Sequence, residues 1–168
     1  MMRARTTMIL PFPHEIYDDV TAITPAELRR LGVRGLLLDI DGTLARTKDP
    51  APSEAVSRWL GLMRRSGVAL YVLSNNKSPA RTERFAQMIG CSWRHRSRKP
   101  ARRGFLAAAE ELGLRPEELA IVGDQIWTDV LGGLRCNMKT LMVQSTDTYL
   151  WYFPLRRLVE LPFRRPRR

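Results

Sequence analysis

The stretch of sequence that decides the fold is LLLDIDGTL, which runs from Leu36 to Leu44. It overlaps a longer apolar run, Val33 to Ile40, that holds Asp39 near its end and is followed by Asp41. A short, nearly continuous apolar run predicts a strand that is buried on both faces of a sheet. The sequence therefore predicts two acidic side chains at the end of a buried strand, where the chain turns at Gly42.

Outward from this stretch, similar apolar runs recur along the chain, and helix-like segments separate them. Further strands are expected at Val68–Leu73, Leu119–Val122 and Lys139–Gln144, with a weaker candidate at Cys91–Arg96. Helices are expected at Pro25–Leu31, from Pro52 to about Arg65, from Ser78 to near Gly90, between Pro100 and the stop at Gly113, and at Trp127–Arg135. This alternation predicts an α/β fold in which helices cover both faces of a mostly parallel, five-stranded sheet.

The composition is that of a basic globular domain. A chain of 168 residues favours one domain and is long enough to bury a core. Its 28 Lys and Arg residues outnumber 17 Asp and Glu, giving a formal net charge of +11. Such a charge favours polyanionic partners: nucleic acid, an anionic membrane surface or a phosphorylated substrate.

The two cysteines and the hydropathy of the sequence indicate the cellular compartment of the protein. Cys91 and Cys136 form no Cys-x-x-Cys pair and fit a reducing compartment. The apolar patch Met8-Ile9-Leu10 is too short for the core of a secretory signal, and no apolar run approaches membrane-spanning length. We therefore expect a cytoplasmic protein, either soluble or peripheral on the inner face of the cell membrane.

Polar side chains follow four of the expected strands. They are Asp39 and Asp41, Ser74 and Asn75, Lys99, and Asp124 and Asp129. In open α/β sheets, ligands bind in the crevice beyond the carboxyl ends of the strands. The sequence therefore predicts that these four segments converge on one site.

The residue types at this site favour phosphoryl chemistry with a metal ion. Clustered carboxylates repel one another, so a hard divalent ion such as Mg²⁺ is expected among them. Asp39 and Asp41 lie two apart on a strand and share a face, so one carboxylate can attack phosphorus while the other handles a proton. Lys99 and Ser74 are placed to hold the charge of the transferring phosphoryl group.

The chain resembles the haloacid dehalogenase superfamily of phosphatases at four ordered motifs. These are LLLDIDGTL, VLSNN at Val72–Asn76, the pair Lys99-Pro100, and IVGDQIWTD at Ile121–Asp129. The resemblance implies a three-layer Rossmann-like sandwich. It also implies that Asp39 is the nucleophile and Asp41 the general acid and base. The phosphate ligands would be Ser74, Asn75 and Lys99, helped by backbone amides near Gly42 and Thr43. Mg²⁺ would be held by Asp39, the backbone carbonyl of Asp41, Asp124 and, through water or Lys99, Asp129.

A narrower resemblance covers the lead-in Phe12–Leu44 and the block from Lys99 to Val143, which look like the YqeG family. That family is related to mitochondrial phosphatidylglycerophosphate phosphatases, so the resemblance implies a lipid phosphate as substrate. Two alternatives stay open: a phosphatase of a soluble sugar phosphate or nucleic-acid terminal phosphate, and a basic RNA- or ribosome-associated module with a residual site. We see no recognised RNA-binding motif, so a nucleic-acid partner is not expected. The oligomeric state stays open.

The spacing of the motifs leaves no room for an inserted cap domain. One helix and one strand fill the chain from Asp41 to Ser74, and another such pair fills Ser74 to Lys99. An open site suits a large substrate or a lipid headgroup. We expect a phosphatase domain over residues 1–148 and a basic, aromatic tail over residues 149–168.

Two interpretations of the tail stay open. Its aromatic residues stand beside Arg156-Arg157, and further arginine pairs lie at Arg164-Arg165 and Arg167-Arg168, as in an interfacial membrane anchor. Alternatively, a helix packs Leu150, Phe153, Leu155 and Leu158 on the core and leaves a frayed basic end. Both interpretations can hold together.

Overall fold

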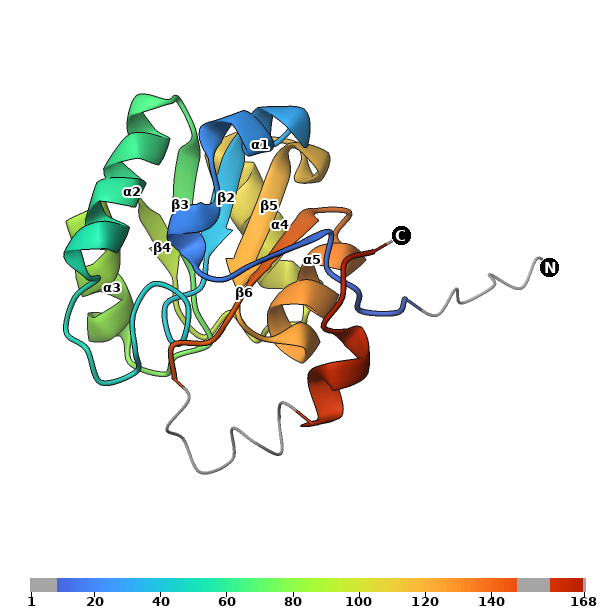
Figure 1. The fold of residues 1–168 in the computed structure, drawn as a ribbon. Coiled ribbons are helices and arrows are strands. Elements are labelled where there is room, and N and C mark those ends of the chain that lie inside the picture. The colour runs from blue at the N-terminus through green and yellow to red at the C-terminus, as the bar shows by residue number, and fades with distance from the viewer. Residues whose placement is uncertain (1–8, 148–157, 168) are drawn as a thin grey trace.

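A six-stranded parallel sheet runs through the centre of the computed structural model, which describes residues 9–147 and 158–167 (Figure 1). The strands are β1 (Glu15–Tyr17), β2 (Gly35–Leu38), β3 (Ala69–Leu73), β4 (Ser92–Arg94), β5 (Leu119–Gly123) and β6 (Lys139–Val143). Their order across the sheet is β1-β6-β5-β2-β3-β4, and every pairing is parallel. The carboxyl ends of all six strands therefore lie at one edge, with β2 between β5 and β3.

Five α-helices connect the strands, and their ends lie where the capping residues predict. They are α1 (Pro25–Arg30), α2 (Glu54–Arg65), α3 (Pro79–Ile89), α4 (Arg102–Leu112) and α5 (Leu131–Arg135). The hydroxyls of Ser53 and Ser78 accept hydrogen bonds from the first turns of α2 and α3. Gly90 and Gly113 end α3 and α4 in the left-handed conformation. A π-helical turn, Ile126–Val130, leads directly into α5.

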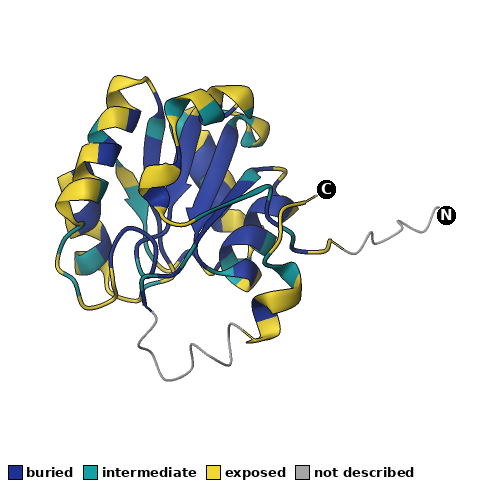
Figure 2. Ribbon diagram, viewed as in Figure 1, coloured by how far each residue is buried: buried dark blue, intermediate teal, exposed yellow. Residues whose placement is uncertain are grey.

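The sheet is buried on both faces, as its apolar strands predict (Figure 2). Leu36 and Leu38 of β2 pack in the cluster that includes side chains of α1, α2 and α3. Leu37, which points the other way, packs in the cluster with Phe105 of α4. This alternation of side chains between two helical layers makes the three-layer α/β sandwich that the sequence predicts.

The strand that the sequence analysis missed is β1, so the sheet has six strands and not five. Glu15 of β1 is in register with Leu141 of β6, and Ile16 with Met142. This strand has only three residues, all half-buried, and includes a charged side chain. It is too short and too polar to stand out as an apolar run. The weak candidate at Cys91–Arg96 does form a strand, β4.

No inserted domain interrupts the fold between Asp41 and Lys99, a stretch that the structure describes throughout. It contains only α2, β3, α3, β4 and their connections. The expected absence of a cap is therefore confirmed. In the described ranges, no helix is long and apolar enough to span a membrane.

The end of the chain packs against the domain. Phe163 packs on the small apolar cluster around Ile126 and Met142, and its ring centroid lies 5.2 Å from that of Trp127. The Arg164 side chain is 9% exposed and donates to Gln144 Oε1 at 2.6 Å. Leu158, which one interpretation packs on the core, is 66% exposed. Leu150, Phe153, Leu155 and Arg168 lie outside the described residues.

Candidate active site

The carboxyl ends of the central strands converge on one polar pocket. Its lining combines carboxylates, amides, hydroxyls and one ammonium: Asp39, Asp41, Ser74, Asn75, Asn76, Lys99, Gln125 and Thr128. Five of these positions were predicted from the sequence, and residues from all four predicted segments meet at the pocket or border it. The convergence follows from the parallel order β5-β2-β3-β4, which sets the strand ends side by side.

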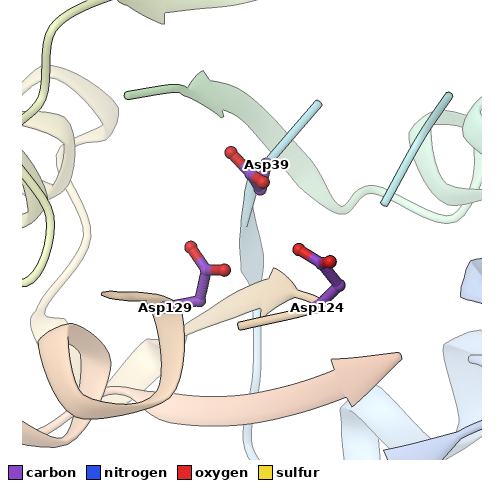
Figure 3. A group of neighbouring side chains, drawn as sticks. All are labelled: Asp39, Asp124 and Asp129. Carbon is purple, nitrogen blue, oxygen red and sulfur yellow. The ribbon is translucent and has the colours of Figure 1, made fainter. Parts of the chain in front are cut away.

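Three carboxylates gather at the base of this site. Asp39 follows β2, Asp124 follows β5, and Asp129 lies on the π-helical turn. One oxygen from each lies within 4.8 Å of the others, and all three residues are buried. Figure 3 shows their carboxyl groups directed toward a common space. The Asp39 N–H donates to the Val122 carbonyl at 3.0 Å and so continues the sheet ladder up to the site.

Two glycines make room for these carboxylates. Gly42 has φ +83°, and a Cβ there would lie 2.7 Å from Asp124 Oδ2. A Cβ at Gly123 would overlap the Asp129 side chain. A side chain at either position would displace an acidic group, so both glycines serve the close approach of backbone to carboxylate.

Lys99 places a positive charge between two of the carboxylates. Its Nζ lies 2.6 Å from Asp39 Oδ1 and 2.7 Å from Asp129 Oδ1. Burial alone would lower the pKa of Lys99, but Asp129 and Asp39 outweigh burial and raise that pKa above its ordinary value. Lys99 is therefore a permanent cation at this site.

The same surroundings disfavour full ionisation of Asp39. Burial raises its pKa to about 8, against the attraction of Lys99 and with the repulsion of Asp129 and Asp124. The Lys99 ammonium is shared between Asp39 and Asp129, and it does not cancel the effects of burial and of carboxylate repulsion on Asp39.

A divalent cation fits this donor set. The oxygens of Asp39, Asp124 and Asp129 are hard donors, close enough for a single ion to reach all three. A cation bound among these carboxylates would also relieve the repulsion that helps to raise the pKa of Asp39. The chemistry of the donors thus matches Mg²⁺, the ion expected from the sequence.

Asn75 and Ser74 organise the second strand end. The Asn75 amide accepts from the Lys99 N–H at 2.7 Å and donates to the Lys99 carbonyl at 3.1 Å. Ser74 is buried, and its hydroxyl accepts from the Asn76 N–H at 3.0 Å. Asn75 thereby holds the backbone of Lys99, and Ser74 stands at the pocket wall.

Gly42 and Thr43 do not line the pocket. Their N–H groups donate within the turn, to the carbonyls of Ala45 at 2.9 Å and Ile40 at 3.1 Å. The structure therefore does not bring these two predicted phosphate contacts to the pocket with the others.

Asp41 lines the pocket but lies outside the three-carboxylate cluster, and its side chain is 24% exposed. Two residues that the sequence analysis left without a role hold it. Asn76 Nδ2 donates to Asp41 Oδ2 at 2.9 Å, and Arg81 Nη2 lies 2.8 Å from Asp41 Oδ1. Asn76 stands within the VLSNN motif and could have been assigned there. Arg81 is one of 28 basic residues, and no sequence signal distinguishes it.

The C-terminal segment also reaches the site. Glu160 is fully buried and accepts from the Ile126 N–H at 3.1 Å, at the start of the turn that carries Asp129. Its carboxylate pairs with Arg164 at 3.2 Å. The turn below the acidic cluster is therefore anchored by the far end of the chain, which the sequence analysis treated as a separate tail.

Comparisons with known proteins agree with this geometry. The model of the family described as haloacid dehalogenase-like hydrolase matches residues 48–137. The chain is 31% identical over 144 residues to the Bacillus subtilis protein "Probable phosphatase YqeG", across 84% of this chain and 83% of that protein.

Solved structures share the fold. An uncharacterized protein from Listeria monocytogenes serotype 4b has a TM-score of 0.56 at 16% identity, over 70% of this chain and 85% of that chain. One from Corynebacterium glutamicum has a TM-score of 0.54 at 22% identity, over 78% and 94%. The family match and the Bacillus subtilis relative show that the chain belongs to the YqeG family of haloacid dehalogenase-like hydrolases.

Proposed function

We propose that this hydrolase is a magnesium-dependent phosphomonoester phosphatase that works through an aspartyl-phosphate on Asp39. The observation that carries the proposal is the position of Asp39, buried at the end of the central strand among Lys99 and two further carboxylates. A carboxylate held beside fixed positive charge is suited to attack a phosphoryl group whose negative charge the same cations neutralise.

The reaction has two steps. A carboxylate oxygen of Asp39 attacks phosphorus, the bond from phosphorus to the ester oxygen breaks, and Asp41 gives its proton to the departing alcohol. A water molecule then attacks the phosphorus of the aspartyl-phosphate, Asp41 takes a proton from that water, and inorganic phosphate leaves with Asp39 restored. Asp41 lines the pocket, which supports its proposed action on both the alcohol and the water.

The other side chains bind and orient. Asp39, Asp124 and Asp129, with the backbone carbonyl of Asp41, would hold Mg²⁺, which supplies electrostatic stabilisation of the phosphoryl oxygens. Lys99 and Ser74 bind phosphoryl oxygens from the side of β3 and β4. Asn75 fixes the Lys99 backbone through its two hydrogen bonds, at 2.7 and 3.1 Å.

For the substrate, we propose a lipid phosphomonoester, with phosphatidylglycerophosphate hydrolysed to phosphatidylglycerol. The YqeG-like sequence, the net charge of +11 and the absence of a cap between Asp41 and Lys99 support an open site on an anionic surface. The C-terminal segment adds exposed apolar side chains, with Leu158, Val159 and Leu161 being 66%, 53% and 61% exposed. Figure 1 shows this segment at the end of the molecule where the carboxyl ends of the strands lie.

A phosphate-release screen tests the proposal. Purified protein is assayed with phosphatidylglycerophosphate, sugar phosphates, nucleotides and a 5′-phosphorylated oligonucleotide, with Mg²⁺ and with chelator. We expect release from the lipid that disappears in chelator and returns with Mg²⁺, and a higher Mg²⁺ requirement or no activity in Asp124→Ala. Activity with a soluble phosphate alone would reject the lipid substrate and keep the phosphatase; full activity in chelator would reject the metal.

Vesicle sedimentation tests peripheral membrane binding on its own. We expect binding to anionic vesicles that weakens in salt, and weaker binding by Leu158→Ser/Leu161→Ser. Leu62→Ser on α2, also exposed, is the matched control and should bind normally. Charge reversal is informative at Arg165 and Arg167, which are exposed, whereas Arg164 is held in a buried pair with Glu160. Equal binding to neutral vesicles would contradict the electrostatic part of this proposal.

A further inference from the structure

Arg81, in the first turn of α3, makes more polar contacts around the site than its surface-helix position suggests. Its Nε donates to Asp41 Oδ1 at 3.0 Å, and its Nη2 lies 2.8 Å from the same oxygen. Its Nη1 donates to the Asp49 carbonyl at 2.6 Å and its Nη2 to the Arg46 carbonyl at 3.0 Å. The guanidinium thus joins the Asp41 carboxylate to the loop that follows it.

The environment of Arg81 holds it in this position. Its side chain is only 17% exposed, and its Cζ lies 4.8 Å from the centroid of the Phe85 ring, one turn further along α3. Stacking on an aromatic face fixes the plane of a guanidinium, and the planar fork then reaches several acceptors at once. A lysine offers no such fork, so the contacts require arginine.

Both oxygens of Asp41 are occupied by this arrangement. Arg81 holds Oδ1, and Asn76 holds Oδ2 at 2.9 Å. Asn76 is itself fixed, because its Oδ1 accepts from the Ser78 N–H at 2.8 Å just before α3. The orientation of the Asp41 carboxylate is therefore set by α3 and its N-terminal connection.

The loop after Asp41 has a second, independent tie. The buried carboxylate of Asp147 accepts from the Thr47 N–H at 2.9 Å and from its hydroxyl. Asp147 comes from the segment after β6. Arg81 and Asp147 therefore hold the same loop from two sides, but of these two only Arg81 also touches the Asp41 carboxylate.

We propose that Arg81 is a positioning residue that orients the Asp41 carboxylate toward the oxygen of the leaving alcohol. Its bonds to the carbonyls of Arg46 and Asp49 couple that orientation to the loop 46–49. The inference rests on the proposed function, since it gives Asp41 the role of proton donor in the first step. An acid that is wrongly oriented protonates the leaving oxygen poorly. The penalty therefore grows as the alcohol becomes a poorer leaving group.

Leaving-group dependence separates positioning from a general structural effect. Wild type, Arg81→Gln, Arg81→Lys and Asp147→Asn are compared by kcat/KM with 4-nitrophenyl phosphate, which hardly needs an acid, and with phenyl phosphate, which does. For Arg81→Gln we expect a loss about 10-fold larger with phenyl phosphate than with 4-nitrophenyl phosphate. Arg81→Lys should recover part of that difference. Asp147→Asn loosens the same loop and should lower both activities equally.

A double-variant cycle completes the test. If Arg81 acts through Asp41, Arg81→Gln should add little to the leaving-group dependence of Asp41→Asn. Equal losses of Arg81→Gln on both substrates, or full additivity with Asp41→Asn, would overturn the inference while the wild-type phosphatase activity stands. Absence of wild-type activity on every phosphomonoester would instead reject the proposed function.

Discussion

The ammonium of Lys99 lies 2.6 Å from the nearer carboxylate oxygen of Asp39, and the two side chains are 2% and 7% exposed. This pair joins the end of the central strand β2 to the loop after the edge strand β4. Because both side chains are buried, little solvent screens the attraction between them.

Replacing Lys99 with methionine should destabilise the metal-free protein by about 3–5 kcal/mol, since Asp39 and Asp129 would lose their buried cation. Mg²⁺ should restore part of this loss, so its addition should raise the unfolding temperature more in Lys99→Met than in wild type. Thermal unfolding with chelator and with Mg²⁺ measures both effects. An equal Mg²⁺ response in the two proteins would contradict this account of the charge.

Asp39→Asn should lower turnover by about 10⁴-fold or more while the protein stays folded, because an amide is a poor nucleophile toward phosphorus. The variant should also fail to trap a beryllium fluoride adduct, which mimics the aspartyl-phosphate. Asp18→Asn, at an exposed position, is the control and should keep full activity. Near-normal turnover by pure Asp39→Asn would contradict the covalent mechanism.

Binding of Mg²⁺ at pH 7 should release up to about one proton per ion. The pKa of Asp39 is raised to about 8 in the metal-free cluster, so that carboxyl holds a proton at neutral pH that a metal must displace. Affinity for Mg²⁺ should therefore rise with pH up to about 8 and then level off. Calorimetric titration in two buffers of different ionisation enthalpy counts the proton.

The raised pKa of Asp39 also makes the stability of the metal-free protein depend on pH. A raised carboxyl pKa means that the folded state binds more protons than the unfolded state between the ordinary value of 3.8 and about 8. The stability of the metal-free protein should fall as pH rises through that window. Asp39→Asn should remove both this slope and the proton release, and a wild-type titration that releases no proton would contradict the interpretation.

Glu160→Ala should weaken Mg²⁺ binding although the residue lies outside the acidic cluster. It removes the acceptor for the Ile126 N–H at the start of the turn that carries Asp129, and it breaks the pair with Arg164. We expect a loss of about 1–3 kcal/mol in the free energy of unfolding, and a higher Mg²⁺ requirement. Glu117→Ala, at an exposed position, should change neither quantity. Unchanged metal affinity would mean that the C-terminal segment stabilises the domain without shaping the site.

The predictability of this structure follows the length and polarity of its segments. Leu36–Leu38 and Leu119–Val122 were predictable because uninterrupted apolar residues at this length have few alternatives to a buried strand. The short edge strand β1 was not, because its half-buried residues carry no apolar run. Its partner lies more than 120 residues away, as the pairing of Glu15 with Leu141 shows, and such a pairing leaves no local sequence signal.

The residues of the site also fall into a group that the sequence predicts and a group that it does not. The meeting of Asp39, Ser74, Lys99 and Asp124 at one edge was predictable because each directly follows a strand or its loop and parallel strands end together. Arg81 and Glu160 act through side chains that reach across the fold, 40 and 34 residues along the chain from their partners Asp41 and Ile126. Charge counting cannot single out such residues, since their importance comes from what they contact.

The two outermost strands of the sheet bear on self-association. Both β1 and β4 have three residues, and β4 ends in Arg94. A strand this short offers a passing chain few unpaired N–H and C=O groups to bind. The strand next to β1 is β6, which has five residues; its last four are buried and its last three, Leu141 to Val143, are apolar. Proteolytic removal of the segment up to Tyr17 would take away β1 and leave β6 as the exposed edge strand of the sheet. We therefore expect such cleavage to cause aggregation even where the catalytic groups are intact.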